Sequence, residues 1–198
     1  SLRYYNVQNK YIGNQNSLVN TIQYKNNCFF LSSSDTNIVY LLYTEGYGYY
    51  PRLVYAIYDK SKEQFTSTKL PILGFNNILN VNVLETESDC NYIISVITMD
   101  TMYSFNFLNG NVSLKGKTPQ KQGVFDNPFG INSCFAAGGR FLFAVSEIQR
   151  SQFSRLPLFR YNFDTITGIF SNRVLVDSIF QYYTNFVPSF NDSFIIYI

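Results

Sequence analysis

The sequence predicts an all-β fold, and three features of the chain lead to that prediction. Short apolar runs rich in β-branched and aromatic residues alternate with Asn, Asp, Gly and Ser, as strands alternate with turns. No stretch keeps apolar residues at helical spacing over three turns, and the pattern allows only one short helix, within residues 174–183. The strand-like runs also recur at a regular interval. The clearest runs are Cys28–Leu31, Ile38–Tyr43, Tyr92–Ile97, Phe141–Val145 and Phe194–Tyr197.

The regular interval is clearest in a hairpin that occurs twice. The segment starting at Tyr55 aligns without gaps with the segment starting at Arg160, and two matched pairs are 105 residues apart: Asp59 with Asp164, and Phe65 with Phe170. Residues 103–113 repeat this hairpin with a turn two residues shorter, and residues 4–12 are a fainter copy.

A turn leading into an apolar strand precedes each hairpin. Counting from Asp35 through Asp89 and Gly139 to Asp192 gives steps of 54, 50 and 53 residues, and another apolar run lies before each turn. Four strands in a period near 52 residues are typical of a β-propeller blade, because one four-stranded sheet cannot bury both of its apolar faces alone. A β-sandwich with coincidental spacing explains the 105-residue match less well.

The repeat predicts one propeller domain over residues 1–198. The expected division is a blade part at 1–17, blades at about 18–70, 71–118 and 119–176, and a blade part at 177–198. The chain therefore starts on the third and fourth strands of a blade and ends on the first two strands of another. Either the ends meet in a closed four-bladed ring, or the chain is a segment of a larger propeller. Closure is slightly favoured because it removes unpaired edge strands.

Composition excludes several functions. The 198 residues carry a net charge of +2, and 46% are hydrophobic and 18% aromatic, which suits one domain with a sizeable core. With only 14% charged residues and no basic excess, a nucleic-acid partner is not expected. The chain has no histidine, so histidine-based catalysis and histidine-bound metals are excluded. No apolar run is long enough to span a membrane.

The three cysteines, Cys28, Cys90 and Cys134, lack the CxxC spacing of a zinc site. They are either buried thiols, the favoured interpretation, or one disulfide with one thiol left over.

The glycosylation sequons at Asn111 and Asn191 are no more frequent than chance predicts. Low charge with abundant Tyr, Asn and Ser points weakly to an extracellular or cell-surface protein. The start of the chain is neither an initiator Met nor a signal peptide, which suggests a processed form or a fragment.

The hairpins resemble known propeller repeats. Residues 58–71 look like the closing hairpin of a kelch repeat, with Phe65 where kelch usually has Trp and without the paired glycines that precede it. Residues 163–170 look equally like hairpins of lactonase-type propellers. The resemblance implies the fold superfamily and no individual family, so it assigns no catalytic residue.

In propellers, ligands tend to meet the face built by the loops between blades and between second and third strands. Two such loops stand out here, at residues 44–53 and 147–157. The first combines glycines, tyrosines and an arginine, a composition typical of protein- or glycan-binding surfaces, although its tyrosines could simply cover a blade edge. The second is polar and basic, and more typical of a solvated loop than of an anion site. The candidate binding residues are Tyr47, Tyr49, Tyr50, Arg52, Gln152 and Arg155.

The recurring aspartates Asp35, Asp59, Asp89, Asp164 and Asp192 all fall at tight turns, where Asp binds its own backbone, so calcium binding is not expected. No motif for a cofactor, metal or catalytic nucleophile is present.

We therefore expect a non-catalytic recognition module that binds a protein or glycan through its loop-rich face. One alternative is a hydrolase of lactonase or glycosidase type that uses two carboxylates near the propeller channel. The other is a structural piece of a larger assembly, whose further blades come from another chain or from elsewhere in the same protein. The candidate carboxylates are Glu45, Asp100, Asp126 and Glu147.

Overall fold

The computed structural model describes twelve segments of the chain. They are residues 3–5, 11–14, 28–45, 52–66, 70–73, 78–86, 90–120, 131–136, 138–146, 155–180, 186–188 and 195–197. Every regular element among them is a β-strand, and all strand pairs are antiparallel. None of the described residues forms a helix that could cross a membrane.

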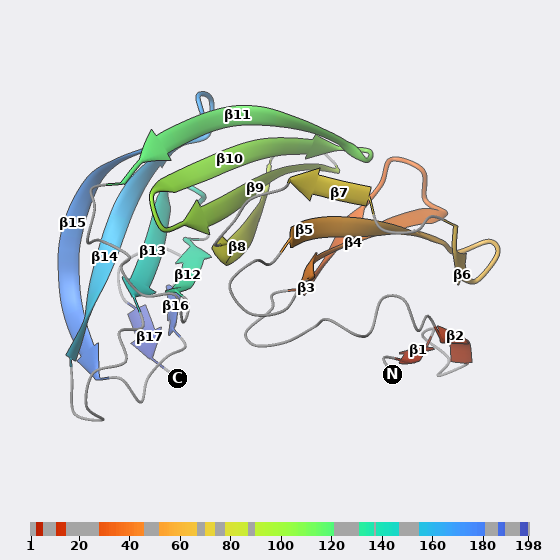
Figure 1. Cartoon of the computed structure of the whole chain (residues 1–198), viewed down its shortest axis with the longest axis horizontal. Helices are drawn as coiled ribbons and strands as arrows, with labels where there is room; N and C mark the ends of the chain where they lie inside the picture. Colours follow the sequence, from red (N-terminus) through yellow and green to blue (C-terminus); the bar gives the residue numbers. More distant parts are fainter. Residues whose placement is uncertain are drawn as a thin grey trace.

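Three large sheets follow one another along the chain (Figure 1). The first sheet contains β3 (Cys28–Ser32), β4 (Ile38–Glu45), β5 (Arg52–Asp59), β6 (Gln64–Phe65) and β7 (Leu70–Leu73). The second contains β8 (Ile78–Glu85), β9 (Asn91–Thr98), β10 (Thr101–Leu108) and β11 (Asn111–Pro119). The third contains β12 (Ile131–Phe135), β13 (Phe141–Ser146), β14 (Arg155–Asp164) and β15 (Ile169–Phe180). In the first sheet β6 and β7 both pair with β5, so together they take the place of one fourth strand. The predicted β-propeller of four-stranded antiparallel blades is confirmed, while the blade boundaries and the interval near 52 residues stay predictions.

The predicted hairpin repeat has its counterpart in the pairing. Tyr58 pairs with Phe65 and Phe163 pairs with Phe170, with ring centroids 5.4 and 4.6 Å apart. Both hairpins close through four turn residues, whereas in the second sheet Leu108 pairs with Asn111 across a two-residue turn. The predicted difference in turn length is therefore confirmed.

The short helix considered within residues 174–183 is not formed. Residues 174–180 extend β15 and pair with β14, with Val174 opposite Arg160 and Leu175 opposite Phe159. The β-branched side chains of this stretch favour a strand, and pairing with a long neighbouring strand supplies the backbone hydrogen bonds that a helix would otherwise make.

Each sheet packs face to face against the next. We call the face of a sheet that looks toward the following sheet its forward face, and the opposite face its rear face. The forward face of the first sheet and the rear face of the second form one apolar core, which includes Leu42, Tyr55 and Phe107. The forward face of the second sheet and the rear face of the third form another, which includes Ile97 and Phe163. Radial stacking thus buries both faces of the middle sheet, as expected for blades.

The sheets form an open arc rather than a closed ring (Figure 1). The fourth strands β11 and β15 lie on its convex side, and the first strands β8 and β12 lie toward its concave side. The terminal hairpins are β1 (Arg3–Tyr5) with β2 (Tyr11–Asn14), and β16 (Phe186–Pro188) with β17 (Ile195–Tyr197). Among the described strands each terminal hairpin pairs only within itself, and the two lie at opposite ends of the arc. The slight preference for closure is therefore wrong for this structure, because three sheets at this curvature span only part of a turn.

Candidate functional site

The last residues of the second strands and the first residues of the third strands lie on one face of the arc, because antiparallel sheets of equal topology stacked side by side share their edges. In the first sheet this edge is marked by Glu45 opposite Arg52, and in the second by the turn from Thr98 to Thr101. In the third sheet it is marked by Arg155, the first residue of β14. We call this edge the loop face.

The structure places two of the six predicted binding residues on the loop face. Arg52 begins β5 with an exposed side chain, and the backbone of Arg155 begins β14 opposite Phe180. The other four, Tyr47, Tyr49, Tyr50 and Gln152, lie outside the described residues. Binding by the six residues therefore stays a prediction.

A polar network occupies the loop face of the second sheet. The Thr98 hydroxyl lies 2.8 Å from Oδ1 of Asp100 and 2.8 Å from the carbonyl oxygen of Thr101, and it accepts a bond from the Thr101 amide. The Gln120 amide donates to the Asp100 carbonyl at 2.6 Å. Thr98 is buried and Asp100 is exposed, so the hydroxyl holds a solvent-facing carboxylate in place.

This network continues into the third sheet through Tyr161. The Tyr161 hydroxyl donates to Oε1 of Gln120 at 3.4 Å, and the ring packs in the core between the second and third sheets. Burial raises the pKa of Tyr161 to about 12, although the neighbouring Arg173 guanidinium acts in the opposite direction. Tyr161 is therefore a protonated hydrogen-bond donor at neutral pH.

Thr98, Gln120 and Tyr161 were not predicted as site residues from the sequence. The loops that hold Thr98 and Gln120 were recognisable from the repeat, but the link to Tyr161 spans 41 residues and two sheets.

Of the four candidate carboxylates, Asp100 is described with its side chain. Glu45 ends β4, but its side chain is outside the described part, as are Asp126 and Glu147 altogether. A two-carboxylate site therefore stays a prediction. Within the described segments, no group of three or more Cys, Asp or Glu side chains could hold a metal ion.

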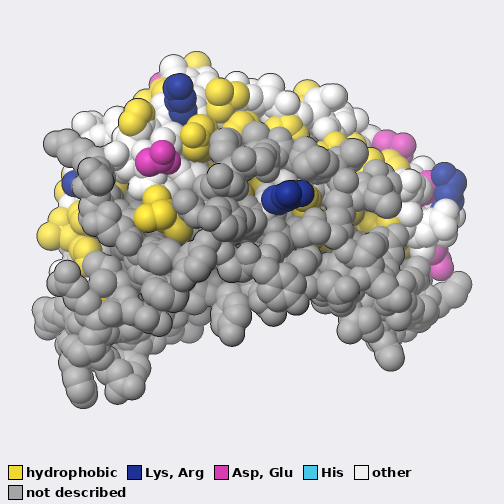
Figure 2. All heavy atoms as spheres, viewed as in Figure 1, with side chains coloured by type: hydrophobic (Ala, Val, Ile, Leu, Met, Phe, Trp, Pro, Cys, Tyr) yellow, Lys and Arg dark blue, Asp and Glu magenta, His cyan; other side chains and the backbone are white. Residues whose placement is uncertain are grey.

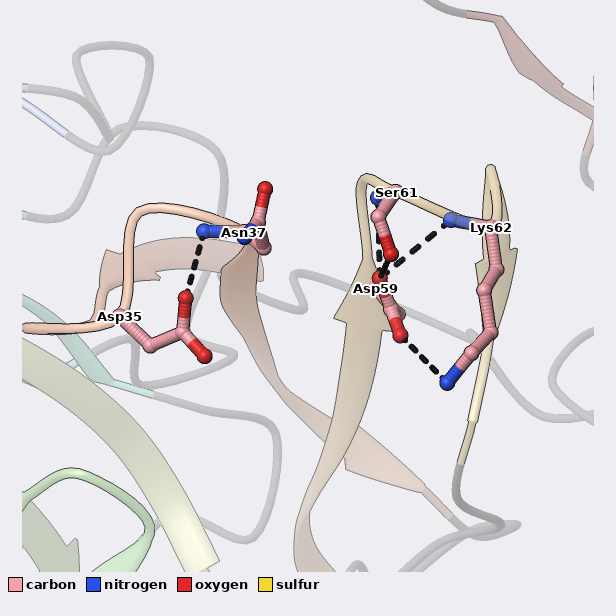
Figure 3. A network of polar contacts seen from close by, with 5 residues as sticks. All are labelled: Asp35, Asn37, Asp59, Ser61 and Lys62. Atoms are coloured by element: carbon pink, nitrogen blue, oxygen red, sulfur yellow. Dashed lines mark hydrogen bonds and ion pairs between the residues drawn. The ribbon is translucent and has the colours of Figure 1, made fainter.

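The predicted turn role of the aspartates is confirmed for Asp35, Asp59 and Asp164, and Figure 3 shows the first two. Oδ1 of Asp59 accepts bonds from the amides of Ser61 and Lys62, at 2.9 and 3.3 Å, and Oδ2 lies 2.8 Å from the Lys62 ammonium. Asp164 accepts the equivalent bonds from residues 166 and 167. Asp89 and Asp192 lie outside the described residues.

Cys90 and Cys134 are both free cysteines, as the favoured prediction expected, but each is half-buried rather than buried. Burial raises the pKa of the Cys134 thiol to about 12, so it is not a nucleophile at neutral pH.

Charge is sparse over the described surface. In the view of Figure 2, acidic and basic side chains are few and scattered, while hydrophobic side chains gather along the convex edge. No large patch of one charge is visible on the part of this face that is coloured.

Comparisons with known proteins support the fold. No protein-family model and no curated protein matches the chain. Among solved structures, a putative 6-phosphogluconolactonase from Bacteroides fragilis matches with a TM-score of 0.53 and 12% identity, over 86% of this chain and 47% of that one. This chain therefore spans about half the length of that protein. The likeness shows a shared β-propeller fold.

Two other solved structures are more distant. One belongs to the GH130 family, described as containing glycoside hydrolases that target β-1,2 mannosidic linkages in Candida mannan. It has a TM-score of 0.46 and 15% identity, over 77% of this chain and 52% of that one. The other is the NanB sialidase of Streptococcus pneumoniae, with a TM-score of 0.44 and 14% identity, over 76% of this chain and 23% of that one.

Proposed function

We propose that the chain is part of a carbohydrate-active β-propeller of lactonase or glycosidase type, which takes an anionic sugar derivative at its loop face. The observation that carries the proposal is that each of the three sheets has an ionisable residue at this edge: Arg52 is exposed on the first sheet, Asp100 is exposed on the second, and Arg155 begins β14 in the third. The putative lactonase with the same fold supports the choice of substrate class.

The arginines suit an anionic ligand. A guanidinium binds carboxylate and phosphate groups through two parallel hydrogen bonds, and it keeps its charge at all physiological pH values. Arg52 has the exposure that such a role requires. The backbone of its cross-strand neighbour Glu45 lies at the same edge.

Asp100 is the described residue best suited to act as a general base. The chain has no histidine, and Asp and Glu are common among the other side chains that serve as general bases. Its Oδ1 is bound by Thr98, which leaves Oδ2 to take a proton from a water molecule. The water oxygen would bond to the lactone carbonyl carbon, the ring C–O bond would break, and the proton would pass to the departing ring oxygen.

Binding is tested first with 6-phosphogluconate, and with gluconate as the phosphate-free control, by calorimetry on the whole chain. A hydrogen-bonded charge contributes roughly 1.5–3 kcal/mol, so R52A should weaken 6-phosphogluconate binding by about 10- to 150-fold. The matched control is R140A, because Arg140 is also exposed but lies at the turn between first and second strands, on the opposite edge. Equal effects of R52A and R140A would contradict the placement of the site.

Turnover is tested separately by following acid release from δ-gluconolactone and its 6-phosphate. The enzyme proposal expects hydrolysis that D100N abolishes while 6-phosphogluconate binding persists. Binding without any hydrolysis by the unmodified chain would instead support the non-catalytic recognition module. If neither ligand binds, the proposed function is wrong.

A second candidate function is supported by the shape of the molecule. An open arc that covers about half of a solved propeller suits a structural part of a larger assembly. This role is compatible with a ligand site, and it depends on what meets the ends of the arc.

A further inference from the structure

The turn between β10 and β11 contains the one Asn-Gly step of the sequence, Asn109 followed by Gly110. Both residues have positive φ, 48° for Asn109 and 82° for Gly110, as a two-residue hairpin turn favours. The Asn109 side chain is exposed. Asparagine followed by glycine is the asparagine step most prone to deamidation, because glycine has no side chain to keep its backbone nitrogen away from the asparagine side chain. The residues that suit the turn therefore also place a labile amide at the surface.

The first sheet holds both residues of this turn. Oδ1 of Asn109 accepts bonds from the Ser33 hydroxyl at 3.2 Å and the Ser34 amide at 3.0 Å, in the turn between β3 and β4. The Gly110 carbonyl accepts a bond from the Tyr55 hydroxyl of β5 at 2.8 Å. In Figure 1 the turn between β10 and β11 extends toward the first sheet. All three bonds therefore exist only while the first and second sheets are packed together.

These bonds restrain the movement that deamidation needs. The Gly110 nitrogen must come within bonding distance of the side-chain carbon Cγ of Asn109, so the side-chain amide and the peptide beside it must both rotate. Rotation of the side-chain amide carries Oδ1 away from Ser33 and Ser34. Rotation of the peptide moves the Gly110 carbonyl away from Tyr55. The packed interface thus protects Asn109, and separation of the two sheets at this edge makes it reactive.

We propose that Asn109 is a site of spontaneous deamidation, and that the contact between the first and second sheets sets its rate. In the reaction the Gly110 nitrogen loses its proton to hydroxide and bonds to Cγ of Asn109. The bond between Cγ and Nδ2 breaks, and ammonia leaves with a proton taken from water. A water molecule then adds to one of the two carbonyl carbons of the cyclic imide and breaks the bond from that carbon to the ring nitrogen. The product is aspartate or isoaspartate at position 109.

The two products differ in what they leave of the turn. Aspartate keeps the backbone unchanged and offers a charged oxygen to the same two donors. Isoaspartate adds a CH₂ group to the backbone of a hairpin in which Leu108 and Asn111 pair across only two residues. The isoaspartate form therefore cannot keep both this pairing and the Gly110 carbonyl in place. Deamidation to isoaspartate thus loosens the contact between the first and second sheets.

The first test follows deamidation of the unmodified chain at mildly alkaline pH, in buffer and in urea, by mass spectrometry of the peptide that contains position 109. The proposal expects slow conversion of the folded chain and fast conversion in urea, where the contact is absent. S33A and Y55F each remove one bond, so each should speed conversion in buffer by about 2- to 12-fold. S113A, which alters an exposed serine on β11, should change nothing. Equal rates in buffer and urea, or no acceleration in S33A and Y55F, would overturn the proposal.

A further variant, S104A, separates the contact from general loss of stability. The Ser104 hydroxyl of the second sheet donates to the Gly168 carbonyl of the third at 2.7 Å, so S104A weakens the other interface and leaves the bonds to Asn109 in place. Conversion in S104A should therefore stay close to that of the unmodified chain. If S104A speeds conversion as much as S33A does, global unfolding sets the rate and the proposal is wrong.

A second test compares the products. Deamidation lowers the net charge of +2 by one unit, so ion exchange separates converted from unconverted chains. N109D matches the aspartate product and should unfold at the same urea concentration as the unmodified chain, whereas the isoaspartate form should unfold at a lower one. Equal unfolding midpoints for N109D and the isoaspartate form would refute the loosening of the contact. β10 begins at the loop face and ends at this turn, so failure of the proposed function would leave both tests unaffected.

Discussion

The two interfaces between neighbouring sheets join equivalent elements through side chains of opposite size. Between the first and second sheets, Tyr40, Tyr55 and Phe107 meet edge to face, with ring centroids 5.1–5.7 Å apart, and Tyr55 reaches the Gly110 carbonyl. Between the second and third sheets, the facing residues Ser104 and Gly116 are small. The backbone of the turn at Gly168 therefore lies close to the backbone of the second sheet.

The difference follows from the length of the turn. The turn of the second sheet has two residues, Asn109 and Gly110. The turn of the third sheet has four, residues 165–168, and it extends further toward the preceding sheet. A long donor on the facing strand bridges to the short turn, and a short donor with a glycine beside it leaves room for the long turn. Both interfaces therefore contain a hydrogen bond from the third strand to the glycine carbonyl of the next turn, although the donor is Tyr55 in one interface and Ser104 in the other.

The largest expected effect comes from filling the space that the long turn needs. A methyl group on Gly116 would lie 2.5 Å from the Gly168 carbonyl oxygen, and backbone cannot move aside as a side chain can. We expect G116A to lower the free energy of unfolding by about 2–3 kcal/mol, as overpacked cores do. Urea unfolding would measure this change. S113A, an exposed position on the same strand, should change stability by less than about 0.5 kcal/mol, and a similar loss in both variants would refute the argument.

A smaller effect is expected from removing either donor. S104A should cost about 1–2 kcal/mol, since its bond to Gly168 is fully buried, and Y55F about 0.5–1 kcal/mol, since its bond is only partly buried. The same urea experiment ranks the two. If Y55F costs more than S104A, burial does not decide the strength of this repeated contact.

The smallest effect concerns the two aspartate turns and depends on pH. The bonds from Lys62 and Ser61 lower the pKa of Asp59 from 3.8 to about 2, and those from Thr167 and Ile166 lower the pKa of Asp164. A carboxyl whose pKa is lower in the folded state stabilises the fold above its unfolded pKa, and this contribution is lost as the pH falls through the folded value.

Thermal unfolding between pH 5 and 2 should therefore show a weaker pH dependence for D59N than for the unmodified chain. Added salt should reduce the difference, because Lys62 forms an ion pair with Asp59, whereas Asp164 is held by a hydroxyl and backbone amides. An unchanged pH profile in D59N would show that the turn does not depend on the ionised carboxylate.

Local pattern was enough to predict the strands, the hairpin repeat and the turn aspartates. Alternating apolar runs specify a strand, and Asp59 and Asp164 bond to residues only two or three positions away, so both signals lie within one segment. The segment after Val174 was ambiguous between helix and strand for the same reason, because its state depends on pairing with β14 rather than on its own residues.

The sequence by itself thus determined the β-propeller class, the matching hairpins and the exclusion of histidine chemistry. Only the tertiary structure decided that the arc is open, that Tyr161 meets Gln120, and that the first sheet holds Asn109. These features depend on the angle and distance between sheets, which are set by side chains packed from segments tens of residues apart. Short-range patterns carry no information about such distances.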